Sequence, residues 1–356
     1  MVDKIKGTII LLLFVLLCTS SILAVDNKNV VDLQEIIERA LQENIDLQLA
    51  ELNLEDARLN YKKNQLDNLL SSSRLFELQS ELDKIQAEEN YKDIRDNLIL
   101  EVISDYIDII SNEQQLITAQ KEVELEEKRV EEVRAQVEVG YKGSLELFEQ
   151  ENDHLAAVNS MEKLKDEMAQ KLQELKQKIA IDNNSKIKLV KLVKPEIWAV
   201  SEEDVLNTAI SNNAVVEIKK KKVILAENDL KKAKVSDTPE LDLRKKEIIL
   251  EKAHLELTQE EQNLVNDVQI KYIQYKQAVK NINMAEKSVI QAEGHFKIIK
   301  EQNNAGLVSK NDLLSSELSL YEAENEFVES IINYYISKLN IQKVMGMELE
   351  VNLDYE

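Results

Sequence analysis

The sequence repeats itself across its two halves, and this duplication constrains the fold more than any other feature. The segment EIIERALQENIDL at 35–47 aligns with DVLNTAISNNAVV at 204–216, an offset of 169 residues that pairs Asn44 with Asn213. Later in each half the offset becomes 166, and the matched pairs are then Tyr106 with Tyr272, Ala119 with Ala285, Gly140 with Gly306 and Glu151 with Glu317. The change of three residues indicates a loop of different length. We therefore expect two copies of one structural unit.

Each unit is expected to consist of long helices, because residues that interrupt helices are scarce. The 356 residues include only 6 Gly and 2 Pro, and 4% are aromatic against 31% that are charged. This composition is typical of long amphipathic helices, and it leaves too few rings to fill a globular centre. Between Val268 and Ile299, apolar residues recur at spacings of three and four, which predicts a sustained helical seam of the coiled-coil type.

We expect three helices in each half, at about 31–63, 75–139 and 144–181, and at about 201–234, 241–304 and 309–346. At 1.5 Å per residue, the longest would extend roughly 95 Å and would need partner helices to stay helical in water. Pro195, Pro239, Gly140, Gly143 and Gly306 fall in the predicted connections. Short turns make consecutive helices antiparallel. The predicted fold class is therefore all-α, with long antiparallel coiled-coil hairpins in two tandem repeats.

The expected domain organisation has five segments: a signal peptide at 1–24, a first helical repeat at 25–182, a connector at 183–200, a second helical repeat at 201–347 and a tail at 348–356. In the first segment, Lys4 and Lys6 precede an apolar run from Ile9 to Leu17, and a cleavage point follows Ala24. The run is shorter than the ~20 residues of a membrane-spanning helix. We expect export, with retention of this segment as an anchor as the alternative. In the connector, lysines partly alternate with apolar residues, which favours either a short strand or an extended ledge packed on the helices.

The single cysteine, Cys18, lies in the same leader segment. A lipoprotein signal has a small residue before its cysteine, whereas Leu17 stands there in this sequence. Lipidation is therefore the less favoured alternative. After cleavage at Ala24 the chain would hold no cysteine and no disulfide.

Composition and motifs exclude several classes of function. A net charge of −22 opposes binding to the phosphates of nucleic acid. His154, His254 and His295 have no metal-ligand partner at helical spacing, and neither a Gly-x-Ser-x-Gly motif nor a phosphate loop occurs. We therefore expect no enzyme, no catalytic residue, no metal and no cofactor. The run from Lys219 to Lys222 spreads over all faces of a helix, so we expect a solvated surface paired with acids; binding to lipid headgroups is the alternative.

Three features together resemble the TolC-like outer-membrane efflux proteins. They are the opening LQEIIERALQEN, the turn that occurs twice in register as GYKGSLEL at 140–147 and GLVSKNDL at 306–313, and the closing stretch from Glu317 to Gly346. The resemblance covers nearly the whole chain after the leader. It implies a trimer whose twelve long helices form a hollow periplasmic α-barrel, joined to a β-barrel in the outer membrane. It also implies hairpin tips that face an adaptor protein and an inner-membrane pump.

The sequence departs from this family where the membrane strands should lie, between the first two helices of each half. Two membrane strands and a turn need more than ~20 residues of alternating apolar character. The inserts NQLDNLLSSSR at 64–74 and VSDTPE at 235–240 are shorter and do not alternate. We therefore expect a TolC-like α-barrel subunit without the membrane β-barrel, for which direct insertion into a membrane is doubtful.

The leading functional hypothesis is a periplasmic helical conduit, or a component of an export or efflux assembly, in the periplasm or associated with the outer membrane. The alternative is an exported coiled-coil spacer with no transport role. By resemblance, the residues that face the adaptor are those of the two turns: Gly140, Gly143, Leu147, Gly306, Ser309 and Leu313.

The resemblance also implies acids that narrow the mouth of the channel just beyond each turn glycine. The acid six residues beyond the glycine is Glu146 in the first half and Asp312 in the second. The acid nine residues beyond is Glu149 in the first half, but Ser315 occupies that place in the second. A structural alternative is that Glu146 and Asp312 cap the helices that they begin, since an acid in the first turn favours the helix dipole.

Overall fold

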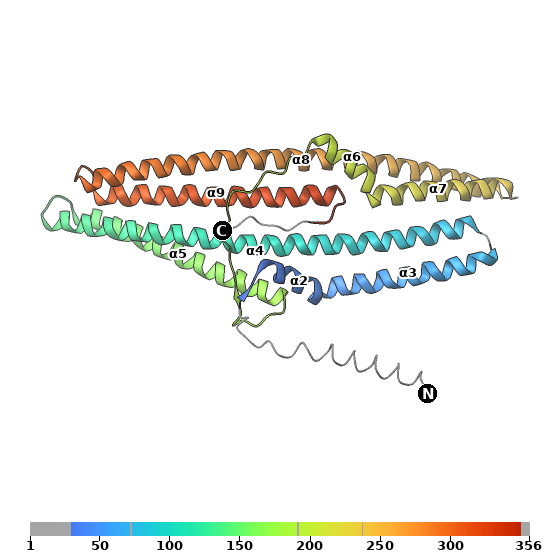
Figure 1. Ribbon diagram of the computed structural model, residues 1–356, viewed down its shortest axis with the longest axis horizontal. Coiled ribbons are helices and arrows are strands. Elements are labelled where there is room, and N and C mark those ends of the chain that lie inside the picture. The colour runs from blue at the N-terminus through green and yellow to red at the C-terminus, as the bar shows by residue number, and fades with distance from the viewer. Residues whose placement is uncertain (1–29, 72, 191, 237, 350–356) are drawn as a thin grey trace, which may run out of the picture.

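The computed structural model describes residues 30–349 except 72, 191 and 237. The first half contains β1 (Val30–Val31), α2 (Leu33–Glu43), α3 (Ile45–Ser71), α4 (Arg74–Glu138) and α5 (Ser144–Lys178). The second contains β2 (Lys186–Ile187), α6 (Glu202–Asn212), α7 (Ala214–Val235), α8 (Glu240–Asn304) and α9 (Lys310–Val344). The expected all-α fold in two repeats is confirmed (Figure 1). The expected signal peptide, Cys18 and most of the C-terminal tail lie outside the described residues.

The long hairpins of the two repeats have equal dimensions. Helices α4 and α8 each span 65 residues, and α5 and α9 each span 35. The bounds of each pair differ by 166, which is the offset of the sequence repeat. The duplication therefore extends to the length and limits of each long helix.

The expectation of a single helix at the start of each half is wrong, because the chain forms two helices there, α2 and α3 in the first half and α6 and α7 in the second. The breaks fall at the paired residues Asn44 and Asn213, whose ψ angles of 118° and 105° are extended. The Oδ1 of Asn44 accepts from the Leu47 N–H at 2.8 Å, and that of Asn213 accepts from the Val216 N–H at 2.7 Å. Each asparagine thus caps the helix that follows it, which compensates for the break.

The inserts where membrane strands would lie serve as helix and tight turn. Helix α3 continues through most of the first insert to Ser71, and α4 begins at Arg74. Helix α7 ends at Val235 and α8 begins at Glu240. Neither insert contains a strand in the residues that the structure describes. In that part of the chain, no helix has both the length and the apolar character needed to cross a membrane.

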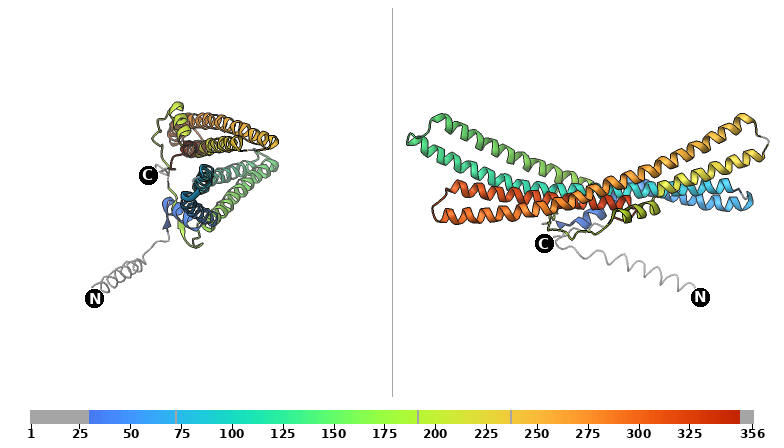
Figure 2. Two further views of the ribbon diagram at one scale, coloured as in Figure 1. Left: turned by 90° about the vertical axis from the view of Figure 1, so that its right-hand side faces the viewer. Right: turned by 90° about the horizontal axis from the view of Figure 1, so that it is seen from above.

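The helices form an elongated bundle with α4 at its centre. Helix α4 contacts α2, α3 and α5 of its own repeat, and α7 and α9 of the second repeat. Helix α8 contacts α6, α7 and α9, so α8 lies along one flank of the bundle while α3 and α5 lie along the other (Figures 1 and 2). Both glycine turns lie at one end, which we call the tip end, and the α3–α4 and α7–α8 turns lie at the opposite end.

Two buried tyrosines, Tyr106 and Tyr334, and the half-buried Tyr272 hold the connector against the helices. The Tyr106 hydroxyl donates to the Lys188 carbonyl at 2.8 Å, and the Tyr272 hydroxyl donates to the Val200 carbonyl at 3.3 Å. The Tyr334 hydroxyl donates to the Glu196 carbonyl at 3.1 Å and accepts from the Trp198 N–H at 2.9 Å. The connector also supplies β2, which lies where the sequence predicts a short strand and pairs in parallel with β1. The two repeats are therefore joined by a strap whose backbone groups are bonded to side chains of the helices.

The contact between repeats includes a buried carboxyl group, that of Asp96. Its side chain on α4 is 2% exposed, and Lys92 and Lys343 carry the nearby charges together with Arg95 and Asp93. Burial raises the pKa of Asp96 above its ordinary value, and the three cations only partly offset that effect. Lys92 also donates to the Gly346 carbonyl at 2.6 Å, which ties α4 to the end of α9.

Replacing Tyr334 with Phe should destabilise the fold without altering its shape. The substitution removes the hydrogen bonds to the Glu196 carbonyl and from the Trp198 N–H. At about 0.5–1.5 kcal/mol for each bond, we expect a loss of about 1–3 kcal/mol in the free energy of unfolding. Chemical denaturation measures the effect. Tyr141→Phe is the matched control, because that side chain is 86% exposed. Equal stability of the two variants would contradict the role given to the strap.

The Asp96→Asn variant should gain stability over the natural protein as pH rises. The raised pKa of Asp96 means that its ionised form is disfavoured more in the folded than in the unfolded chain. Its contribution to stability is therefore present below the ordinary aspartate pKa and is lost as pH rises through the raised value. Urea unfolding at pH 4 and pH 7 should show a larger advantage of the variant at pH 7. The same difference at both pH values would disprove this assignment.

Candidate functional site

The two hairpin tips are built by a glycine in the left-handed region at the end of each long helix. Gly140 has φ +80° and Gly306 has φ +70°, a conformation that costs other residues more than glycine. After α4, the Tyr141 N–H donates to the Gln136 carbonyl at 2.8 Å. After α8, the Leu307 N–H makes the equivalent bond to the Gln302 carbonyl at 2.9 Å. The repeated sequence thus produces the same turn twice, as predicted.

The two acids that follow the turns cap the returning helices. Ser309 and Asp312 form a reciprocal box: the Ser309 hydroxyl accepts from the Asp312 N–H at 3.1 Å, and the Asp312 carboxylate accepts from the Ser309 N–H at 2.9 Å. Hydrogen bonds from the hydroxyl and N–H of Ser309 hold the pKa of Asp312 below its ordinary value. In the first repeat, Glu146 accepts from the Gly143 N–H at 3.1 Å, which is half of the same arrangement. Within one copy of the chain, Glu146 and Asp312 therefore both act as helix caps.

The third acid of the expected set differs between the repeats. Glu149 is exposed on α5. Its counterpart, Ser315 on α9, accepts from the Arg129 guanidinium at 3.4 Å and so contributes to the contact between repeats. The positions have the same place in the repeat but different surroundings, because α9 lies against α4 while the outer face of α5 is open.

Apolar side chains are exposed at the tip end. Val139, Tyr141 and Leu307 project from the two turns, whereas Leu147 and Leu313, one turn into the returning helices, are partly buried. The structure therefore brings all the predicted turn residues to one end of the molecule. Val139, Tyr141 and Leu307 also expose apolar surface at this end, and of these three residues none is among the predicted site residues.

Sequence analysis also missed apolar rows along the two flanks. The α3 stripe consists of Ile45, Leu52, Leu59 and Leu66, spaced by seven and each more than half exposed. The α5 stripe consists of Leu145, Phe148 and Leu155, and the α8 stripe of Leu241, Ile248, Leu255 and, near the tip, Ile298. A repeat of seven residues is the signal of a coiled-coil partner, and it could have been found in the sequence.

The other predicted surface residues have ordinary surroundings. In the lysine run, Lys219 lies 2.9 Å from Glu256 and Lys221 lies 3.0 Å from Glu81, so two of the four lysines pair with acids as expected, although both are half-buried. The described residues contain no group of His, Cys, Asp and Glu side chains that could hold a metal ion.

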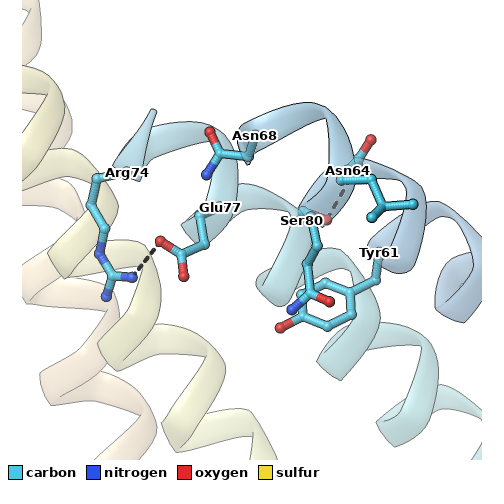
Figure 3. A pocket seen from close by; sticks show the side chains of 8 residues that line it. Tyr61, Asn64, Asn68, Arg74, Glu77 and Ser80 are labelled. Atoms are coloured by element: carbon cyan, nitrogen blue, oxygen red, sulfur yellow. Dashed lines mark hydrogen bonds and ion pairs between the residues drawn. The ribbon is translucent and has the colours of Figure 1, made fainter. Parts of the chain in front are cut away.

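A pocket of about 700 Å³ lies at the end opposite the tips, between α3 and α4 (Figure 3). Its polar side chains pair with one another: Arg74 lies 2.8 Å from Glu77, and the Asn64 amide donates to the Ser80 hydroxyl at 3.2 Å. Because these groups bond to each other and do not converge on a shared point, the pocket does not have the character of a ligand site.

The chain is similar to known proteins both in sequence and in fold. Residues 240–347, which comprise α8, its turn and α9, match the family "Outer membrane efflux protein". No curated protein sequence matches the chain. The fold is similar to that of several solved proteins, three of which are described here in turn. The outer membrane protein VceC from Vibrio cholerae has a TM-score of 0.64 and 12% identity over 89% of this chain and 97% of that one. The outer-membrane channel OprN has a TM-score of 0.67 and 12% identity over 89% and 90% of the two chains.

The Campylobacter jejuni CmeC outer membrane channel has a TM-score of 0.63 and 14% identity over 90% of this chain and 87% of that one. At these identities the likeness shows a shared fold. The resemblance to the outer-membrane efflux proteins is confirmed: residues 240–347 match the sequence model of that family, and the described chain shares its helical fold with VceC, OprN and CmeC.

Proposed function

We propose that this chain is the subunit of a TolC-like efflux conduit in which three copies close a hollow helical barrel in the periplasm. The observation that carries the proposal is the apolar rows on both flanks of a bundle whose helices are otherwise amphipathic. Rows spaced by seven residues along helices are the usual means by which helices associate side by side. A ring of copies would cover both flanks at once, and its closure at three is what the family resemblance implies.

The hairpin tips would form the entrance of the conduit. Three copies would bring three Glu146 and three Asp312 carboxylates to one mouth, a ring of six. Crowded carboxylates raise one another's pKa values, whereas the hydrogen bonds from Ser309 lower that of Asp312 in the single copy. Such a ring would attract cations, and Glu149 would add three more acids behind it.

The proposed partners follow from the same end of the molecule. The exposed Val139, Tyr141 and Leu307 supply apolar area for a periplasmic adaptor protein, which would connect the tips to an inner-membrane pump. In this role the chain guides a substrate and catalyses no reaction. Its place is the periplasm, at or near the outer membrane.

The full-length protein should sediment as a particle of three times the protomer mass of 40.9 kDa. The apolar area of the flanks favours association, so the trimer should persist at micromolar concentration. Analytical ultracentrifugation across a dilution series measures this mass. A monomer or a simple dimer at all concentrations would contradict the conduit and favour the coiled-coil spacer.

Replacing both Glu146 and Asp312 with Ala should abolish binding of a trivalent lanthanide ion to the tips while leaving the helix content unchanged. The double variant removes helix caps as well as carboxylates, so a control is needed that removes a cap alone. Ser309→Ala is that control. That control should lower stability by about 1 kcal/mol through its missing cap but should retain the six acids. Isothermal titration calorimetry and thermal unfolding on the same samples measure both effects. A double variant that unfolds at a lower temperature but binds the lanthanide as the natural protein does would contradict the proposed ring of acids at the mouth.

A further inference from the structure

A groove between three helices lies in the half of the bundle that is remote from the tips. Helix α7 packs on both α4 and α8, and the three helices line a pocket of about 690 Å³ near the α7–α8 turn (Figure 1). We call this pocket the α7 groove. Its volume is within the roughly 300–1,000 Å³ that is usual for pockets that hold small molecules. Its apolar lining consists of Leu75, Phe76, Leu225, Ala226, Ile249 and Ala253.

The acids in and beside the α7 groove are already paired with cations. Asp229 and Glu256 belong to the lining, and their partners across the α7–α8 hairpin are Lys246 and Lys219 respectively. Two further acids flank the α4 part of the lining in the sequence, and they also have partners. These pairs are Glu77 with Arg74, 2.8 Å apart, and Glu81 with Lys221, 3.0 Å apart.

Two lysines of the lining, Lys222 and Lys252, have no such partner. Among the described residues, neither side chain forms a salt bridge or a hydrogen bond. The hydrogen bond and the charge of Lys219 lower the pKa of Glu256, and the charges of Lys222 and Lys252 lower it further. Three cations therefore surround one carboxylate, which leaves two positive charges in excess on a chain whose net charge is −22.

The α7 groove changes in character along its length, from apolar near the α7–α8 turn to cationic farther from it. On α8, Ile249 lies nearer the turn than Lys252, and on α7, Leu225 lies nearer the turn than Lys222. Phe76 is in the first turn of α4, which begins at the same end of the molecule. The lining thus has the polarity of a site for a molecule with one apolar end and one anionic end.

The first repeat shows that the helical fold does not require this lining. Its counterpart positions, found with the offsets of 169 and 166, are acidic or polar. The counterparts of Phe76, Leu225 and Ile249 are Asp242, Asp56 and Asp83, and those of Lys222 and Lys252 are Asn53 and Gln86. The apolar and cationic lining is therefore a particular property of the second repeat, and the counterparts are residues that these helices tolerate.

The α7 groove is separate from the apolar rows on which the proposed conduit depends. At 3.6 residues per turn, its α8 residues are centred roughly 90° around the helix from Ile248 and Leu255 of the α8 stripe. Phe76 is 39% exposed and Ile249 is 51% exposed, so a ligand can reach both. The groove is complete within one copy of the chain, and a ligand site there does not rest on the proposed function.

We propose that the α7 groove binds a single-chain amphiphile with an anionic head, of the fatty-acid class. The carboxylate accepts hydrogen bonds from Lys222 and Lys252, and the chain lies along Leu225, Ile249 and Phe76 toward the α7–α8 turn. The head gains charge-assisted hydrogen bonds, and the chain gains free energy from the apolar area that it covers. A neutral chain lacks the first contribution, and a cationic chain is repelled by the lysines.

Isothermal titration calorimetry of the full-length protein with sodium decanoate, kept below its micelle concentration, tests the proposal. We expect one decanoate per copy, and about tenfold weaker binding of 1-decanol, which lacks the charged head. Lys222→Asn with Lys252→Gln introduces the residues of the first repeat. This lysine variant should bind decanoate as weakly as decanol, and its binding of decanol should equal that of the natural protein.

A second variant tests where the chain lies. Phe76→Asp with Ile249→Asp also introduces the residues of the first repeat, and it should abolish binding of both decanoate and decanol. Its matched control is Ile224→Asp with Ile273→Asp, because these residues are 42% and 65% exposed and lie outside the lining. The control should bind decanoate as the natural protein does. Circular dichroism compares the helix content of the variants, and the lysine variant gives an independent result if the apolar variant loses helix.

The contrary outcomes are distinct. Equal decanoate binding by the apolar variant and its control would overturn the proposal, since the chain would then lie elsewhere on the surface. Decanol that binds the natural protein as tightly as decanoate would also overturn it, because the lysines would then play no part. An anionic lipid in a bilayer is the other source of such a head. Flotation with vesicles of phosphatidylcholine and phosphatidylglycerol, without any binding of decanoate, would replace the ligand site with a membrane contact.

Sedimentation of the same samples keeps this proposal apart from the conduit. A monomer that binds decanoate as expected would support the α7 groove and contradict the conduit. A trimer that binds no decanoate would contradict the groove alone.

Discussion

A helix of 65 residues must bury an apolar row along roughly 95 Å of its length, and this requirement organises the molecule. Helix α4 meets it within the chain, because partners from both repeats lie along it. Helix α8 has the same length and the same place in its repeat, yet its outer flank is open. The glycine turns and the helix caps shape each hairpin, and the tyrosine strap holds the connector against the helices. The two hairpins cross at an angle (Figure 2), with the flank of α8 on one side and that of α3 and α5 on the other.

The duplication provides two copies of each position, and their differences show how the surroundings have shaped each residue. Phe148 is exposed where its counterpart Leu314 is buried, and Glu149 is free of the bond that Arg129 makes to Ser315. Asn44 and Asn213, in contrast, break and cap their helices in the same way. Positions that cap helices within a repeat are therefore alike, whereas Phe148 and Glu149 have surroundings different from those of Leu314 and Ser315.

Much of the fold could be predicted from the sequence, because local rules decide it. The limits of α4, α5, α8 and α9 lie within three residues of those expected, and Gly140 and Gly306 have the positive φ that their position requires. The breaks at Asn44 and Asn213 could not be told from helix interior, since asparagine is tolerated there and the cap depends on one side-chain rotamer. The bonds of Tyr106 and Tyr334 to the connector join residues more than 80 positions apart, and no local pattern signals them. The caps that Glu146 and Asp312 form with Gly143 and Ser309 could be predicted from their spacing of three residues, whereas the proposed ring of carboxylates involves neighbouring copies.

The central claim is that the open flanks close on further copies around a hollow lumen. Electron microscopy of the full-length protein, with particles viewed along their long axis, tests it most directly. The account predicts a ring with three-fold symmetry and a central region free of density, whose wall is formed by repeats alternating in the order first, second, first. A solid bundle with the cross-section of a single chain would contradict it.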